Sequence, residues 1–270
     1  MNSHLKLTII LLLIAIDGFA QVSPGAKQIA LAHSDVSFSN DAFSLFNNSA
    51  LIANSKNREF GFFYSPSPFG EKAMSNAFAS YIEPTSIGNF SAGFSIYGFE
   101  LYKETQFALG YGKNINNNFS FGGTLIYKNV NIKNYGSKGN VLLNLGGKAK
   151  LNEQLGFGFY IENATHSTIS KDDNQVPTVF WGGLHYRPIN DFVFSSALRK
   201  EIGYNVSLRF GAEYTLINFL KLRIGVQNEP SIFHGGFGVI YNFIQFDYAF
   251  SSHNDLGLTH QFGILIRLQK

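Results

Sequence analysis

Residues 206–230 read VSLRFGAEYTLINFLKLRIGVQNEP and alternate between apolar and polar side chains. Over 206–214 every second residue is apolar, and the residues between them are small or charged. After a break at 217–219 the alternation resumes over 220–227. Because side chains two apart lie on one face of a strand, the segment predicts a β-hairpin with one apolar and one polar face.

Two classes of protein show this alternation, and they bury opposite faces. A soluble β-sandwich buries the apolar face, whereas a membrane β-barrel turns it toward lipid. Of the 270 residues, 14% are charged and 16% are aromatic. Soluble domains usually carry about a quarter charged residues, so the composition favours an all-β chain in a membrane. A net charge of +3 without a dense run of Lys and Arg argues against nucleic acid as a partner.

The N-terminus has the features of a secretory signal peptide. Lys6 precedes an apolar run at 7–16, and residues 18–20 give the small-x-small pattern of a cleavage site. The alternative is a membrane-anchor helix, but the run is shorter than the ~20 residues that span a bilayer. We therefore expect residues 1–20 to be a Sec signal peptide. An exported chain with β alternation throughout indicates the cell outer membrane.

The alternation recurs from Arg58 onward and divides the chain into expected strands separated by turn residues. These strands are 58–66, 73–83, 88–99, 103–114, 118–132, 140–151, 155–164, 178–188, 192–201, 206–217, 220–228, 231–242, 244–252 and 256–268. An even number of strands suits an antiparallel barrel closed within one chain. We therefore predict a transmembrane antiparallel β-barrel of about 14 strands over residues 58–270.

The lengths of the connections support the same topology. If the first strand runs outward, every second connection is periplasmic, and these are short: 116–117, 152–154, 189–191, 217–219 and 242–243. The opposite connections include the polar stretches 133–139 and 165–176. Short turns at one end and longer loops at the other are typical of outer-membrane barrels.

Residues 21–57 lack a steady period of two and are expected to form an N-terminal plug-like segment. The residues that suggest a short helix or folded plug include Asp41, Phe43, Phe46, Asn47 and Asn48. A barrel of this size is wide enough to need filling by side chains or by a segment of chain. We expect this stretch to lie within or beneath the lumen, and an exposed periplasmic tail is the alternative.

Two stretches carry a resemblance to one family. The ending FDYAFSSHNDLGLTHQFGILIRL, residues 246–268, resembles the closing hairpin of PorV-like outer-membrane proteins. The residues that carry this resemblance include Asp247, Tyr248, His253, Asp255, Gly257, Thr259 and His260. The stretch DAFSLFNNSALIA, residues 41–53, is similar to the N-terminal segment of the same family and of the wider FadL-like superfamily. One departure is Ser49, where the family typically has proline.

The resemblance implies a function as well as a fold. A PorV-like protein is a non-enzymatic barrel related to type IX secretion, with the translocon and secreted proteins as partners. FadL-like relatives instead pass hydrophobic molecules through the wall and plug. We take an accessory or shuttle role in secretion as the leading hypothesis and a transporter with a hydrophobic ligand as the alternative. Outer-membrane lipid is a partner in both, and neither requires a cofactor.

Charged residues on the polar faces of the last strands are the strongest candidates for an internal site. They are Arg209, Glu213, Lys221, Arg223, Asp247 and Arg267. Because unpaired charges in a partly dry lumen are costly, we expect these residues to pair with one another or with the plug. The resulting network either braces the wall and seals the pore or selects a permeating solute.

Enzymatic chemistry has little support in the sequence. The chain has no cysteine, so it has no thiol nucleophile and no thiolate metal site. The candidates for a hydrolytic site are His166 with Ser167, and His253 with Ser252 and Asp255. Neighbouring polar residues in loops are common without catalysis, so we expect no enzyme. The histidines of the expected strands form no close pair, which disfavours a metal site.

Overall fold

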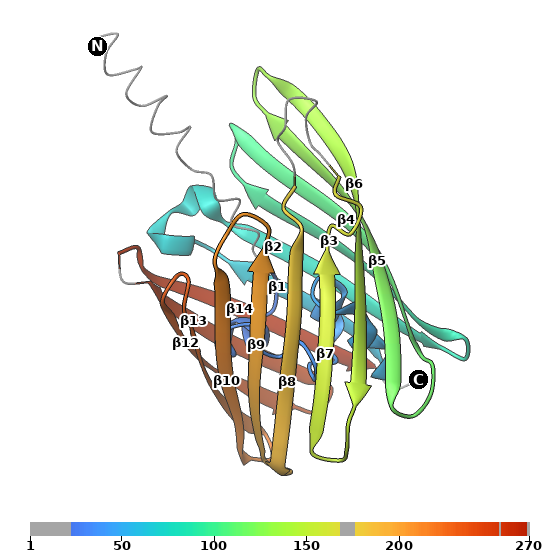
Figure 1. Ribbon diagram of the computed structural model, residues 1–270. Coiled ribbons are helices and arrows are strands. Elements are labelled where there is room, and N and C mark those ends of the chain that lie inside the picture. Colours follow the sequence, from blue (N-terminus) through green and yellow to red (C-terminus); the bar gives the residue numbers. More distant parts are fainter. Residues whose placement is uncertain (1–22, 168–175, 254, 269–270) are drawn as a thin grey trace.

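Fourteen antiparallel strands close into one barrel, as the computed structural model shows (Figure 1). The structure describes residues 23–167, 176–253 and 255–268, and the predicted signal peptide at 1–20 lies outside them. Each strand pairs with its neighbours in the chain, and β14 closes the ring by pairing with β1. Closure pairs the backbone N–H and C=O groups of both terminal strands in hydrogen bonds. Such groups must be paired in lipid, where no water can bind them. The predicted fold class is therefore confirmed.

The first seven strands are β1 (Arg58–Ser65), β2 (Asn76–Thr85), β3 (Gly88–Gly98), β4 (Tyr102–Asn114), β5 (Phe119–Ile132), β6 (Gly136–Lys150) and β7 (Leu155–Glu162). The others are β8 (Val179–Ile189), β9 (Phe192–Glu201), β10 (Val206–Ile217), β11 (Leu220–Gln227), β12 (Ile232–Tyr241), β13 (Ile244–His253) and β14 (Gly257–Leu268). Short connections at 86–87, 115–118, 151–154, 190–191, 218–219 and 242–243 define what we call the turn end. The other connections define the loop end.

Two predicted boundaries are wrong. The expected loop at 133–139 is a tight turn, because Asn134 and Gly136 adopt positive φ angles of 68° and 95° and β6 begins at Gly136. The expected start of the second strand at residue 73 falls in η4 (Lys72–Met74), which follows η3 (Pro68–Gly70). Polar residues in a sequence do not distinguish a long loop from an extended hairpin.

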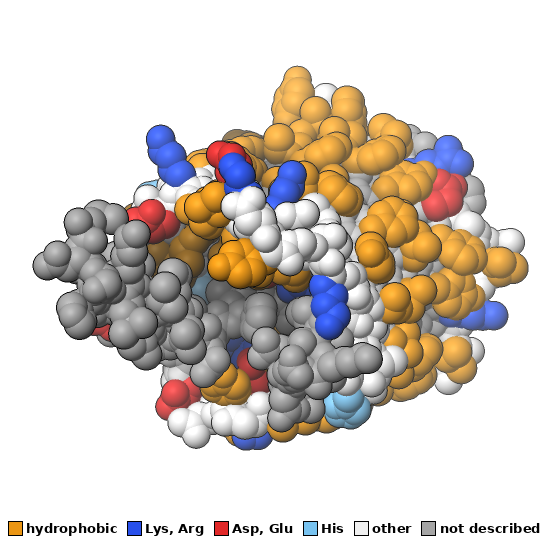
Figure 2. Space-filling model, turned by 90° about the horizontal axis from the view of Figure 1, so that it is seen from above, with side chains coloured by type: hydrophobic (Ala, Val, Ile, Leu, Met, Phe, Trp, Pro, Cys, Tyr) orange, Lys and Arg blue, Asp and Glu red, His pale blue; other side chains and the backbone are white. Residues whose placement is uncertain are grey.

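The apolar side chains of β10 face outward. Along β10 exposed and buried residues alternate, with Val206, Leu208 and Phe210 exposed and Ser207 and Arg209 buried. Figure 2 shows hydrophobic side chains gathered over the outside of the wall in the upper and right parts of the view. A soluble β-sandwich buries its apolar face, so that alternative is wrong and the barrel is a transmembrane one.

Residues 23–57, here called the inner segment, lie inside the ring of strands (Figure 1). The segment contains α2 (Ala26–Ala30), η1 (Ala42–Leu45) and η2 (Ser49–Asn54). The helix α2 packs against β11 to β14, and η2 packs against β3 to β6 on another part of the wall. The segment therefore crosses the interior of the barrel. Within the described ranges, no helix is long and apolar enough to cross a membrane.

Inward-facing glycines let the inner segment approach the wall. A Cβ atom at Gly225 would lie 2.6 Å from the Ala32 backbone nitrogen, and one at Gly112 would lie 2.6 Å from the Ile52 side chain. Both distances are shorter than any real contact of a Cβ atom. Glycine in these strands therefore makes room for another stretch of backbone.

Candidate functional site

A chain of ion pairs runs along the inner face of β10, β11 and β13. Arg223 lies at its centre, donating from Nε to Glu213 at 2.7 Å and from Nη1 to Asp247 at 2.6 Å. Lys221 adds a second ion pair to Glu213 at 3.3 Å. The Arg223 side chain is 1% exposed, so the two carboxylates compensate a guanidinium withdrawn from water.

The same network reaches the seam of the barrel and the inner segment. Gln245 donates to the carboxylate oxygens of Asp247 at 3.0 and 2.8 Å and accepts from Arg267 at 3.0 Å. Arg267 also donates to Glu59 of β1 at 2.6 Å. Glu59 in turn accepts the backbone N–H of Ala42 at 2.6 Å. The network therefore connects β1, β13 and β14 to the inner segment.

Arg209 lies apart from this network, beside the aromatic ring of Trp181. Its Nη1 donates to the Ala32 carbonyl at 3.2 Å, and its guanidinium carbon lies 4.8 Å from the centre of a Trp181 ring. Trp181 stacks on Tyr160 at 5.4 Å and donates from Nε1 to Glu162 at 2.7 Å. Arg209 and Glu213 are four positions apart on β10, which separates them by roughly 13 Å along the strand. Arg209 therefore does not join the ion pairs around Arg223.

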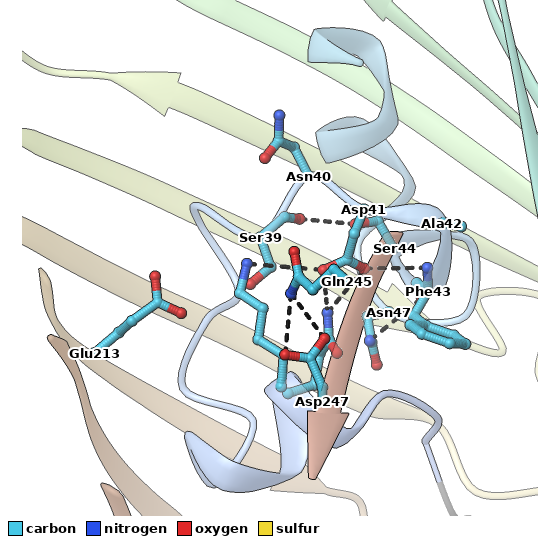
Figure 3. A network of polar contacts seen from close by, with 12 residues as sticks. Ser39, Asn40, Asp41, Ala42, Phe43, Ser44, Asn47, Glu213, Gln245 and Asp247 are labelled. Carbon is cyan, nitrogen blue, oxygen red and sulfur yellow. Dashed lines mark hydrogen bonds and ion pairs between the residues drawn. The ribbon is translucent and has the colours of Figure 1, made fainter. Parts of the chain in front are cut away.

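The predicted plug residues organise the inner segment. Asp41 caps η1 by accepting the Phe43 N–H at 3.1 Å, and it also accepts from Gln28 at 2.9 Å. Asn47 donates to the Phe43 carbonyl at 3.3 Å. Asn48 caps η2 and donates to the Gly147 carbonyl of β6 at 3.1 Å. This hydrogen bond of Asn48 ties the inner segment directly to the wall. Figure 3 shows the part of the inner segment around Asp41 together with Gln245 and Asp247 of β13.

Phenylalanine rings form an apolar contact between the inner segment and β1 and β2. Phe43 meets Phe63 edge-on at 6.3 Å, and Phe46 meets Phe78 edge-on at 5.2 Å. Phe63 and Phe78 meet each other at 5.8 Å and are buried. Here the inner face of the wall is apolar, whereas the last strands carry charged residues on that face.

A groove of about 380 Å³ lies on the outer face of the wall at this position. It is lined by Phe62, Phe63, Tyr64, Ala77, Phe78, Ala79, Phe94, Ile96, Phe246, Phe262 and Ile264. The small side chains of Ala77 and Ala79 account for the depression between larger neighbours. Phe63 and Phe78 border both this groove and the inner segment, so an apolar region extends from the interior to the outer face.

A second cavity, here called the vestibule, has a volume of about 360 Å³ and lies at the loop end. Its lining includes Trp181, Arg209 and His234 from the wall and Ile29 and His33 from the inner segment. Within the described residues, Arg209 Nε and His234 Nε2 are buried without a hydrogen-bond partner. Burial and the nearby Arg209 hold the pKa of His33 well below its usual range, so its imidazole is neutral. Cavities of roughly 300–1,000 Å³ hold small organic ligands.

The residues of the closing hairpin stabilise β13, β14 and the turn between them. His253 Nδ1 accepts the backbone N–H of Asp255 at 3.2 Å, and Gly257 has a φ of 79° that favours glycine. On the outer face Tyr248 and His260 share a hydrogen bond of 2.7 Å. On the inner face Asp247 joins the charge network. Thr259 accepts a hydrogen bond from the Phe69 N–H of the first loop at 2.9 Å.

The residues considered for hydrolysis or metal binding make ordinary structural contacts. His166 shares a hydrogen bond with Thr178 at 2.9 Å. His234 and Ser251 share a part-buried hydrogen bond of 2.9 Å, but among the described residues no carboxylate orients that imidazole, since His234 Nε2 has no partner. Across the described chain, no group of three His, Asp or Glu residues is placed to hold a metal ion.

Several residues of these sites were not singled out from the sequence. Glu59 and Gln245 lie on the polar faces of their strands, so the alternation that identified the other charges also points to them. Trp181 shares the inward face of β8 with His185, which is the only signal that it faces the lumen. Its stacking on Tyr160 involves another strand and has no sequence signature.

Comparisons with known proteins identify the fold. Neither a protein-family model nor a curated protein sequence matches the chain. The toluene transporter TodX of P. putida matches with a TM-score of 0.70 and 12% identity, covering 91% of this chain and 99% of that one. The fold of this chain is similar to that of TodX.

Two further solved structures agree. The toluene transporter TbuX of Ralstonia pickettii has a TM-score of 0.65 and 11% identity, covering 94% of this chain and 98% of that one. A FadL homologue of Pseudomonas aeruginosa has a TM-score of 0.64 and 12% identity, covering 93% and 98%. At these identities the likeness concerns the fold. It does not bear on the PorV-like resemblance, which stays a prediction.

Proposed function

We propose that this protein is a non-enzymatic outer-membrane channel for hydrophobic small molecules, with the inner segment as its plug. The observation that carries the proposal is the position of Phe63 and Phe78, which border both the outer groove and the inner segment. A hydrophobic solute gains little by entering a charged lumen but is stabilised against phenyl rings. An apolar region that crosses the wall therefore offers such a solute a route toward lipid.

The vestibule supports the same proposal. Its volume of about 360 Å³ suits a single small organic molecule. Trp181 and Ile29 supply apolar surface there, beside the charged side chains of Glu162, Arg199, Glu201 and Arg209. The fold is shared with proteins described as toluene transporters. In this proposal, the solute enters at the vestibule and leaves past the phenyl rings after the inner segment moves.

Binding of radiolabelled toluene and palmitate to the full chain in lipid nanodiscs tests the proposal. We expect saturable binding of at least one probe above the level in empty nanodiscs. The double variant Phe43→Ala/Phe46→Ala should change the affinity at least about tenfold, because it removes two rings from the apolar contact. Phe107→Ala, on the outer face of β4 and outside the groove, is the matched control.

The outcomes separate the channel from a purely structural barrel. Folding of each variant is checked by heat-modifiable gel migration, so that lost binding is not mistaken for lost structure. Absence of saturable binding of both probes to the wild type would refute the proposal. Equal effects of Phe107→Ala and the double variant would remove the phenyl contact from the mechanism.

An accessory or shuttle role in type IX secretion is the second candidate, and it rests on the sequence of the closing hairpin at 246–268. Affinity purification of the tagged protein from native outer membranes distinguishes the two. Co-elution of a translocon barrel or of secreted proteins would favour the secretion role. Recovery of the barrel alone, with a hydrophobic compound bound, would favour the channel.

A further inference from the structure

A third cavity lies at the turn end, on the opposite side of the inner segment from the vestibule. Its volume is about 250 Å³, and it is bordered by β5 to β8 and by the end of η2. Gly156 of β7 has no side chain, and the His185 ring of β8 occupies the space beside it, where a Cβ atom would lie 2.4 Å from the ring. The cavity shares no lining residue with the vestibule or the outer groove. It is therefore separate from the proposed solute route.

Basic side chains outnumber acidic ones in the lining of this cavity. Lys148 and Lys150 of β6 and Arg187 of β8 border it, and Glu153 is its one acidic residue. Lys150 pairs with Glu153 at 2.6 Å, which uses that carboxylate. Neither Lys148 nor Arg187 forms an ion pair with any residue that the structure describes. Two positive charges at the cavity thus have no carboxylate partner in the described chain: Lys148 is half-buried, and Arg187 is exposed at the cavity's edge.

The inner segment adds a hydrogen-bond donor to the same cavity. Asn54 lies at the end of η2 and borders the cavity, and its Nδ2 is buried with no partner among the described residues. His185 borders it as well, and its Nδ1 shares a hydrogen bond of 2.8 Å with Ser37 of the inner segment. A buried amide N–H without a hydrogen-bond partner lowers the stability of the fold unless an acceptor binds beside it. An anion could serve as that acceptor and also pair with the Lys148 and Arg187 side chains.

We propose that this cavity binds a small soluble oxyanion with two negative charges, of the size of phosphate. The two uncompensated cations match the charge of such a ligand, and the Asn54 N–H supplies a neutral donor. Charge-assisted hydrogen bonds are stronger than neutral ones, and more so where the site is partly withdrawn from water. The bound anion would bridge β6, β8 and the inner segment, so its binding would hold the inner segment in place.

Isothermal titration of inorganic phosphate into the full chain, reconstituted in zwitterionic lipid nanodiscs, tests this proposal. We expect one saturable site. Lys148→Gln and Arg187→Gln should each weaken binding roughly ten- to hundredfold, because each removes a charge-assisted hydrogen bond. Lys148→Arg should retain most of the affinity. Lys113→Gln is the matched control, since Lys113 lies near the turn end of β4 but is exposed and outside the cavity.

A second variant keeps the test decisive if a charge-removing variant fails to fold. Asn54→Asp places a negative charge at the half-buried end of η2. Repulsion between this carboxylate and phosphate should abolish phosphate binding. Lack of saturable binding to the wild type would overturn the proposal. So would unchanged affinity in Asn54→Asp, or a loss in Lys113→Gln equal to that in Lys148→Gln. None of these results depends on whether toluene or palmitate binds.

Discussion

Removal of Arg223 tests the internal charge network most directly. The Arg223 side chain is 1% exposed, and its ion-pair partners Glu213 and Asp247 are 8% and 2% exposed. Replacement by Met keeps the apolar stem but leaves the buried Asp247 without a cation and leaves Glu213 with only Lys221, at 3.3 Å. Breaking a buried pair by removing one partner costs about 3–5 kcal/mol, so we expect Arg223→Met to lower the free energy of unfolding by that amount.

The assay is urea unfolding of the full chain in lipid vesicles, followed by the fluorescence of Trp181, the single tryptophan of the sequence. The triple variant Glu213→Gln/Arg223→Met/Asp247→Asn removes both carboxylates together with the cation, and Lys221, which loses its partner, is 29% exposed and can be solvated. We therefore expect it to be more stable than Arg223→Met alone. Arg58→Met is the control, because Arg58 pairs with Glu83 at an exposed position, and we expect little change.

Two results would refute this reasoning. If Arg223→Met unfolds at the same urea concentration as the wild type, the ion pairs contribute nothing to stability. If the triple variant is as unstable as Arg223→Met, the loss comes from packing around the guanidinium and not from unpaired carboxylates.

Two further predictions concern the inner segment. Gly225→Ala should release the segment to limited proteolysis, because its Cβ would lie 2.6 Å from the Ala32 nitrogen, whereas Gly182→Ala meets no atom within 4 Å and should not. Burial raises the pKa of Asp35 from its ordinary value of 3.8 to about 6, so the folded form binds the proton more tightly and loses stability as pH rises through that interval. Asp35→Asn should therefore be more stable than the wild type at pH 8, by up to about 3 kcal/mol, with little difference at pH 3 in urea unfolding.

The sequence contained much of the barrel because the decisive pattern is local. Alternation with a period of two assigns each side chain to one face of its strand, and it predicted the break between β10 and β11 at 217–219. The low charged fraction of 14% then indicated which face meets lipid. The alternation also identified Lys221, Arg223 and Asp247 as inward charges.

The tertiary structure decided which inward residues meet. Ala42, Glu59 and Arg267 share hydrogen bonds although Glu59 and Arg267 are 208 positions apart in the chain. The contact exists because the barrel closes between β1 and β14 and because the inner segment folds back against that seam. Alternation gives the face of a side chain but not its neighbour across the ring, since register and closure depend on all the strands together. For the same reason only the folded chain gathers Asn54, Lys148 and Arg187 around one cavity.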